Sequence, residues 1–197
     1  TIYETTPELD ATWQAHQAIK AGNEILIACG GDGTVTEVAT VTREHQKVLG
    51  IIPLGTANAL SQIVYGLRSK LAPIKRACEV ICEQQYTPVD TAECNGKLML
   101  LVSAIGFESQ MIEHADREEK NNGGQMAYLE GLWKAMNTSN PQKLQVTLDD
   151  ESFELDTPSF VIANAAPLST ALAQGGDLPD MTDGELDITW LTPTEDD

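Results

Sequence analysis

The chain has 197 residues, with 12 Lys and Arg against 30 Asp and Glu, so its formal net charge at pH 7 is −18. A chain with this charge is repelled by phosphate backbones, which excludes nucleic-acid binding through a basic face, and anionic membrane surfaces are disfavoured as well. Hydrophobic residues make up 42% of the sequence, enough for a core, and the length suits one large domain or two small ones.

The cysteines and histidines give no support for a zinc site, because there is no CxxC pair and the histidines are far from the cysteines and from one another along the chain. Cys78 and Cys82 are one helical turn apart and could pair or ligate, but small buried side chains are the favoured interpretation. The cysteine pattern indicates a reducing compartment. No basic n-region with an apolar h-region opens the chain and no apolar run approaches the ~20 residues of a membrane span, so we expect a cytoplasmic protein. The four cysteines are Cys29, Cys78, Cys82 and Cys94, and the three histidines are His16, His45 and His114.

Residues 1–87 alternate between apolar runs and helical patterns, which is typical of parallel strands joined by crossover helices. Thr34 and Glu37 have the spacing of a capping box, which predicts that a helix begins there. The first domain, 1–87, is therefore predicted to be a Rossmann-like α/β domain. We expect buried strands at 25–29 and 48–54, the tail of a strand at 1–6, and helices that begin at Pro7, at the turn after Gly30, near Leu60, and at Pro73 with an end near Gln85.

From residue 88 the apolar period changes toward two, and Asn95-Gly96 is a type I′ hairpin signal. We therefore expect a second domain, 88–197, that is mainly an antiparallel β-sandwich with a helical insertion. The segment 164–184 follows neither period, and long irregular loops are usually functional. Further strands are expected at 143–148, 152–155, 160–163 and 186–191, and helices at 108–120 and 125–136.

Two small polar turns follow the two expected parallel strands, at Gly30-Gly31-Asp32-Gly33 and at Gly55-Thr56-Ala57-Asn58. Consecutive parallel strands bring their carboxyl ends to one edge, so both turns open into the same crevice. Glycines allow close approach of the backbone to an anion, and the first amides of each following helix point at it. The pattern predicts a phosphate cradle.

Neither turn contains Lys or Arg, so a bound triphosphate would need a divalent cation, which Asp32 could help to hold. Two plainer interpretations stay open. Glycine turns can simply connect strands to helices, and an aspartate in a turn can be a local cap or Asx-turn residue.

Near the end of the chain, acidic side chains crowd a loop that contains glycine. Hard oxygen donors of this kind suit Mg²⁺ or Ca²⁺, although the spacing is not that of an EF-hand. A solvated acidic loop is the alternative. The acidic residues are Asp177, Asp180, Asp183, Glu185 and Asp187.

The motif Gly30-Gly31-Asp32-Gly33-Thr34-Val35-Thr36-Glu37-Val38-Ala39, followed by Leu54-Gly55-Thr56-Ala57-Asn58, resembles the catalytic domain of the diacylglycerol kinase and sphingosine kinase superfamily, in its bacterial lipid kinase branch. The resemblance continues through Ile105-Gly106-Phe107-Glu108 and Asp183-Gly184-Glu185-Leu186-Asp187. It implies an α/β domain followed by a β-sandwich domain, and transfer of the γ-phosphoryl group of ATP to a lipid hydroxyl such as that of diacylglycerol.

The resemblance also implies the cofactors ATP and Mg²⁺ and a set of site residues. Thr56 would lie at the phosphates, Asn58 would hold its turn, and Asp32 is the candidate catalytic residue that helps to activate the lipid hydroxyl. The Mg²⁺ site would combine the Asp183 carboxylate with main-chain oxygens of Asp180 and Glu185. The implied nucleotide-binding residues are Gly30, Gly31, Asp32, Gly33, Thr34, Val35, Thr36, Gly55, Thr56 and Asn58.

The sequence departs from the family pattern at two positions of the second turn, where Ala59 replaces an acid and Gln62 stands near an expected base. The family's first strand with its Asn-Pro loop and its last strands with a general base have no counterpart here, which fits a portion of a longer polypeptide or a reduced fold. The rival functions are an NAD kinase-like enzyme and a catalytically silent nucleotide-binding module. Expected partners are ATP and a lipid, with a homodimer left open.

Overall fold

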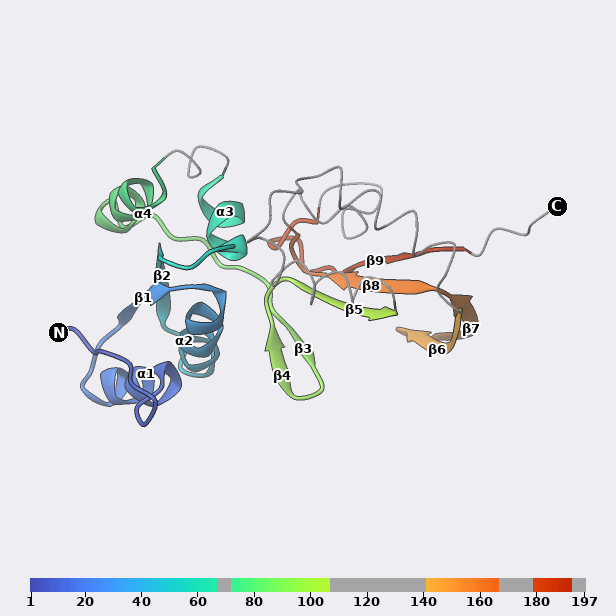
Figure 1. Cartoon of the computed structure of the whole chain (residues 1–197), viewed down its shortest axis with the longest axis horizontal. Coiled ribbons are helices and arrows are strands. Elements are labelled where there is room, and N and C mark those ends of the chain that lie inside the picture. Colours follow the sequence, from blue (N-terminus) through green and yellow to red (C-terminus); the bar gives the residue numbers. More distant parts are fainter. Residues whose placement is uncertain (67–71, 107–140, 167–178, 193–197) are drawn as a thin grey trace. The chain divides into compact units, whose positions relative to one another are not determined.

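The computed structural model describes residues 1–66, 72–106, 141–166 and 179–192 (Figure 1). Contacts between residues divide the chain into two compact units, Thr1–Leu100 and Leu101–Asp197. The first is a mixed α/β unit and the second carries antiparallel sheets. The predicted fold class is confirmed.

In the first unit, two parallel strands pair in register from Ile25 opposite Val48 to Gly30 opposite Pro53. Figure 1 shows α1 and α2 on one side of these strands and α3 and α4 on the other. Contacts between elements join α1 to α2, α2 to β1 and α4 to β2. The elements are α1 (Ala11–Lys20), β1 (Ile25–Gly30), α2 (Asp32–Glu44), β2 (Val48–Pro53), α3 (Ala59–Tyr65) and α4 (Pro73–Cys82).

The predicted capping box of α2 is wrong. This helix begins at Asp32 with Gly31 as its N-cap, so Thr34 already lies inside the helix. The Glu37 carboxylate instead accepts a hydrogen bond from the backbone amide of Ala11 at 3.1 Å, and Ala11 opens α1. The first amides of a helix have no intrahelical acceptor, and α1 obtains one from a neighbouring helix. Glu37 thereby links the two helices.

The first helix also begins later than Pro7. Its N-cap is Asp10, whose carboxylate accepts from the amide of Trp13 at 2.8 Å. The expected strand at 1–6 does not form among the described residues, and α4 ends at Cys82, not near Gln85.

The strand β1 is buried on one face only, which corrects the expectation of a fully buried strand. Leu26 and Ala28 are buried, whereas Ile25 is 51% exposed and Ile27 46% exposed. The helix α4 packs against β2, so it leaves this face of β1 open.

The expectation that Cys78 and Cys82 are small core residues is wrong. Both are exposed and neither forms a disulfide. The helix α4 packs on the sheet through Ala77, which is fully buried. Cys78 and Cys82 lie outside this packed face of the helix.

The Asn95-Gly96 hairpin is confirmed. It joins β3 (Ala92–Cys94) to β4 (Lys97–Met99), with φ of 51° at Asn95 and 75° at Gly96, as a type I′ turn requires. Glu93 of this hairpin lies 3.9 Å from the Arg43 guanidinium of α2. Contacts accordingly group the hairpin with the first unit, although the change of period at residue 88 assigns its residues to the second.

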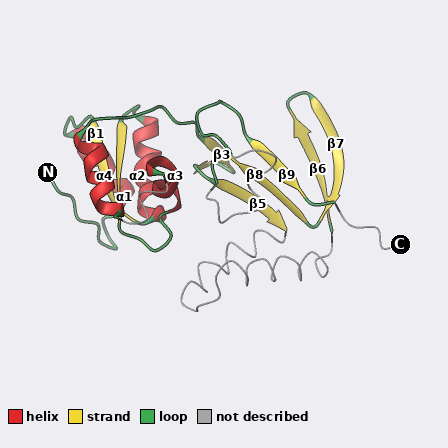
Figure 2. Cartoon of the chain, turned by 90° about the horizontal axis from the view of Figure 1, so that it is seen from above, coloured by secondary structure: helices red, strands yellow, loops and turns green. Residues whose placement is uncertain are grey.

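The described residues of the second unit form a three-stranded antiparallel sheet, in the order β5-β8-β9, and the hairpin β6-β7 (Figure 2). Val161 and Ala163 are buried at its centre against Val102, Ala104 and Ala166. The strands are β5 (Val102–Gly106), β6 (Gln142–Leu148), β7 (Glu151–Thr157), β8 (Ser159–Ala163) and β9 (Asp187–Trp190). The helices expected at 108–120 and 125–136, and much of the loop 164–184, lie outside the described residues.

Gly106 ends β5 with φ of 83°, and a Cβ there would overlap the carbonyl oxygen of Pro158. The glycine of the Ile105-Gly106 motif is therefore required by the backbone of the second unit.

Candidate functional site

The two glycine-containing turns lie at the same edge, as predicted from the parallel strands, and they also touch each other. Gly30 and Pro53 are register partners at the ends of β1 and β2, and the amide of Leu54 donates to the Gly30 carbonyl at 2.9 Å. A Cβ on Gly55 would lie 2.5 Å from the Cα of Gly31. No side chain fits at Gly55, and a Cβ on Gly31 would lie at a tight 3.2 Å from the Cα of Gly55, so the approach of the two turns requires the glycine at position 55.

The second turn is closed by its own side chains. The Asn58 amide group accepts from the Gly55 backbone amide at 2.8 Å and donates to the Gly55 carbonyl at 2.6 Å. Gln62 donates to the Ala57 carbonyl at 2.6 Å, so the residue found in place of the expected base supports the turn. Asn58 therefore holds the turn, while Gly55 and Thr56 remain exposed.

Asp32 joins the two turns. Its carboxylate accepts hydrogen bonds from the backbone amides of Ala59 at 3.1 Å and Leu60 at 3.3 Å, the first two residues of α3. These amides have no intrahelical acceptor, so Asp32 caps a helix that begins 27 residues further along the chain. The capping interpretation is supported, with a long-range partner in place of a local one.

This contact corrects the prediction that both helix N-termini point at an anion. The first two amides of α3 are bonded to Asp32 and are not available. In α2, the amide of Val35 is the first to find a helical acceptor, the Gly31 carbonyl at 3.0 Å. The amides of Asp32, Gly33 and Thr34 precede it and have no intrahelical acceptor. Of these two helices, α2 is therefore the one whose first amides remain available to an anion, at the end where the helix dipole is positive.

The residues of the first motif have different structural roles. Val35 is 3% exposed, so its side chain belongs to the core. The Thr36 hydroxyl donates to the Asp32 carbonyl at 2.8 Å within α2. Gly30 accommodates the Thr34 side chain, whose Cβ would lie 2.8 Å from a Cβ on the glycine. Gly33 is exposed, with open space where a Cβ would lie.

Tyr65 fixes α3 against β2. Its hydroxyl donates to the Ile51 carbonyl at 2.7 Å and accepts from the Ile51 amide at 3.2 Å. Burial raises the pKa of Tyr65 above its usual value, partly offset by the hydrogen bond with Ile51 and increased by Cys78. The second turn lies between β2 and α3, so Tyr65 limits its movement.

In the second unit, the acidic loop has an ordered backbone. The Asp183 carboxylate accepts from the Glu185 amide at 2.9 Å, and the Asp180 carboxylate accepts from the amide and hydroxyl of Thr182 at 3.0 and 2.6 Å. Among the described residues, these carboxylates do not form a group of three that converges on one point. A hard cation here would rely on the second oxygen of Asp183 and on main-chain oxygens, as the resemblance implies.

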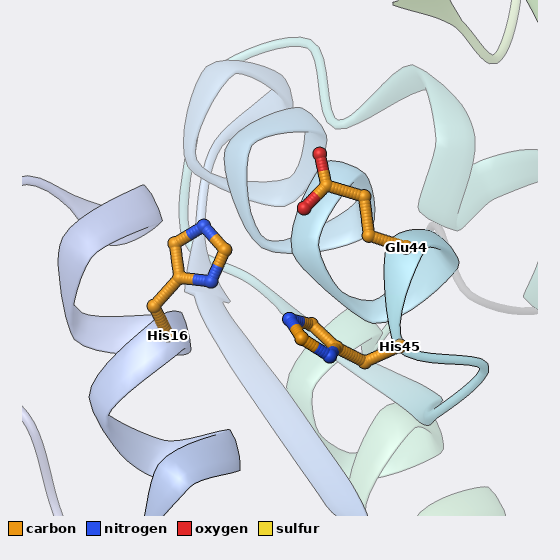
Figure 3. A group of neighbouring side chains, drawn as sticks. All are labelled: His16, Glu44 and His45. Atoms are coloured by element: carbon orange, nitrogen blue, oxygen red, sulfur yellow. The ribbon is translucent and has the colours of Figure 1, made fainter.

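The structure also contains a group of possible metal ligands that was not predicted from the sequence. His16, Glu44 and His45 come together in the first unit, with one ligand atom of each within 4.8 Å of the others (Figure 3). His16 and His45 are far apart along the chain but adjacent in the fold. Their separation along the chain hides this contact, because it depends on the packing of α1 on α2.

No helix within the described ranges is both long enough and apolar enough to cross a membrane.

Known proteins with a similar sequence or fold indicate the family. Residues 1–94 match the family described as the diacylglycerol kinase catalytic domain. An uncharacterized protein of Synechocystis, sll0036, is 39% identical over 199 aligned residues, which cover 94% of this chain and 44% of that protein. A diacylglycerol kinase of Staphylococcus haemolyticus is 29% identical over 162 residues, which cover 81% of this chain and 48% of the kinase.

The crystal structure of a diacylglycerol kinase from Bacillus anthracis shares the fold, with a TM-score of 0.69 at 24% identity over 98% of this chain and 62% of that one. The match of residues 1–94 to the diacylglycerol kinase catalytic domain confirms the recognition from the sequence motifs. The chain spans about half the length of the curated relatives that it matches.

Proposed function

We propose that this chain is part of an ATP-dependent lipid kinase, which transfers the γ-phosphoryl group of ATP to a lipid hydroxyl such as that of diacylglycerol. The observation that carries the proposal is the backbone contact between Gly31 and Gly55 beside the open N-terminus of α2. The match of residues 1–94 to the diacylglycerol kinase catalytic domain supports the reaction class.

In this proposal the phosphates lie against the first turn of α2. The backbone amides of Gly33 and Thr34 donate to phosphate oxygens, and the exposed Thr56 hydroxyl adds a donor from the second turn. Neither turn contains Lys or Arg, so Mg²⁺ would supply the positive charge that the triphosphate needs when bound.

Asp32 has two roles in the proposal. Its carboxylate holds the second turn in place through Ala59 and Leu60. A carboxylate has about four acceptor positions, so two hydrogen bonds leave capacity to accept one from the acceptor hydroxyl. Asp32 is therefore our candidate for the group that orients and helps to deprotonate the lipid hydroxyl.

The loop 180–185 is proposed to hold a second Mg²⁺ in a structural role, through Asp183 and main-chain oxygens of Asp180 and Glu185. The exposed Asp183 carboxylate uses one oxygen on the Glu185 amide, which leaves the other for a cation. The exposed thiols of Cys29, Cys78 and Cys82, which form no disulfide, support a reducing compartment such as the cytoplasm.

The test is phosphoryl transfer from γ-labelled ATP by the complete gene product, with diacylglycerol, sphingosine and NAD as acceptors. Label in a lipid supports the proposal. Label in NAD alone favours an NAD kinase-like enzyme, and ATP binding without transfer to any acceptor favours a silent nucleotide-binding module.

A matched pair of variants shows whether the turn takes part. Thr56→Val removes the hydroxyl of the second turn, and Thr5→Val makes the same change at an exposed threonine outside both turns. Thr56→Val should weaken ATP binding by about tenfold or more, because hydrogen bonds to charged groups contribute roughly 1.5–3 kcal/mol, whereas Thr5→Val should bind as the wild type does.

A further inference from the structure

Three potential metal ligands from two helices meet at the C-terminal end of α2. His16 lies in α1, Glu44 is the last residue of α2, and His45 is its C-cap. The two imidazole rings have centroids 5.7 Å apart at an interplanar angle of 85°. Figure 3 shows the rings of His16 and His45 directed toward each other, with the Glu44 carboxylate beside them. We propose that these three side chains bind one divalent transition-metal ion, with Zn²⁺ the best match.

The donor set supports this class of ion. Two imidazoles and one carboxylate suit zinc and its neighbours, whereas Mg²⁺ and Ca²⁺ prefer oxygen ligands throughout. Zn–N bonds of about 2.0–2.1 Å place tetrahedral ligand atoms about 3.3 Å apart. The present separations of up to 4.8 Å therefore have to shorten by about 1.5 Å. Glu44 and His45 are exposed and His16 is half-buried, so rotamer changes can close this gap.

The backbone beneath the cluster is already ordered. The helix α2 ends in a Schellman motif, in which the amide of Lys47 donates to the Thr42 carbonyl at 2.8 Å and that of Gln46 to the Arg43 carbonyl at 3.2 Å. Gln46 takes the left-handed conformation, with φ of 52°, that this motif requires. The position of His45 is thereby fixed before any metal binds.

The other helix is held as well, because the Glu37 carboxylate of α2 binds the first amide of α1. The C-terminal end of a helix dipole is negative, which favours a cation at Glu44 and His45. The nearby Arg43 guanidinium approaches Glu93 at 3.9 Å, so part of its charge is offset. With a net charge of −18, the whole chain attracts cations.

The cluster is separate from the nucleotide turns. The helix α2 has 13 residues, so its two ends are about 20 Å apart, and the turn at Gly31 lies at the opposite end from His45. A metal at this place would join α1 to α2 and stabilise their packing. Zn²⁺ binding at this cluster does not require the proposed kinase activity.

The test is calorimetric titration of Zn²⁺ into the chain in the presence of excess Mg²⁺. Exposed thiols also bind zinc, so the cysteines are first blocked by alkylation. We expect one Zn²⁺ per chain and a higher melting temperature with Zn²⁺, because the ion stabilises the folded state by mass action. His16→Gln and His45→Gln should each weaken binding about tenfold or more.

Glu44→Gln is a near-isosteric change at an exposed side chain, so it should leave the fold intact, and it should also weaken Zn²⁺ binding. His114→Gln and Glu151→Gln are the matched controls and should bind as the wild type does. Unchanged Zn²⁺ affinity in both His16→Gln and Glu44→Gln would overturn the assignment. So would an equal loss of affinity in His114→Gln, or loss of all binding when the thiols are blocked.

Discussion

The Asp32 carboxylate and the backbone amide of Ala59, 27 residues apart in sequence, form a hydrogen bond of 3.1 Å that ties the start of α2 to the start of α3. The neighbouring Leu60 amide binds the same carboxylate. One side chain thereby sets the distance between the two turns, and the Gly31–Gly55 contact lies beside it. Changes at this position should affect folding and nucleotide binding together.

Asp32→Asn tests the structural part of this role. Asparagine offers one carbonyl oxygen and turns its NH₂ group toward the other amide, so one donor of α3 loses its partner. We expect a loss of about 1–2 kcal/mol in the free energy of unfolding, together with loss of transfer activity in the complete protein. Urea unfolding of the wild type and the variant measures the first effect. Equal stability of the two proteins would show that the cap contributes little.

Ala59→Asp introduces, at the first residue of α3, the carboxylate that the resemblance implies for this position. It brings a negative charge close to Asp32, whose carboxylate binds the Ala59 amide, and no Lys or Arg lies in either turn. We expect weaker ATP binding and lower stability, because like charges repel in a chain already at −18. Calorimetric titration with ATP and Mg²⁺ measures the binding.

Ala59→Asn is the matched control, since it adds nearly the same volume without the charge, and it should bind ATP more tightly than Ala59→Asp. Tighter binding by Ala59→Asp than by the wild type would contradict the charge argument and indicate a site that has lost a useful group.

The paired turns could be predicted from the sequence because their signals are local. A glycine turn after an apolar strand, repeated at residues 30–33 and 55–58, implies a shared edge once the strands are parallel. The contacts of Asp32 with α3, Glu37 with α1 and His16 with His45 could not be predicted, because each depends on how separate helices pack. At Glu37 the local spacing predicted a capping box that does not form, and the carboxylate instead binds the distant Ala11 amide.

Tyr65→Phe should reveal a pH-dependent part of the stability. Burial raises the pKa of Tyr65 in the folded state, so the folded protein holds this proton more tightly than the unfolded chain does. The stabilisation is therefore complete below the unfolded pKa near 10 and is lost as the pH rises through the folded pKa.

The variant lacks both hydrogen bonds to Ile51, and we expect it to lose about 1–2 kcal/mol at neutral pH. The difference in free energy of unfolding between wild type and variant should shrink above pH ~10. Tyr3→Phe, at an exposed tyrosine, should show neither effect. A difference that stays constant with pH would mean that ionisation of Tyr65 is not coupled to folding.

Asp183→Ala separates two contributions of the acidic loop. Loss of the hydrogen bond to the Glu185 amide should cost about 0.5–1.5 kcal/mol with or without metal. If a cation bridges the loop, Mg²⁺ should also raise the melting temperature of the wild type over that in EDTA, and the variant should lack this increase.

Asp150→Ala, at the exposed turn between β6 and β7, is the control and should keep the response to Mg²⁺. Identical melting of the wild type in Mg²⁺ and in EDTA would identify the loop as acidic surface without a bound cation.

The central claim is that the N-terminus of α2 receives the phosphates of the nucleotide, and Gly33→Ala tests it most directly. The position is exposed, nothing lies within 4 Å of the added Cβ, and that Cβ points toward the N-terminal end of the helix. Alanine also favours a helix over glycine by up to about 1 kcal/mol, so the melting temperature should stay the same or rise. The measurement is the affinity for ATP with Mg²⁺ in both proteins. We predict binding at least about tenfold weaker in the variant, since the methyl group occupies the space that a phosphate needs. Unchanged affinity in a stably folded Gly33→Ala protein would contradict the account.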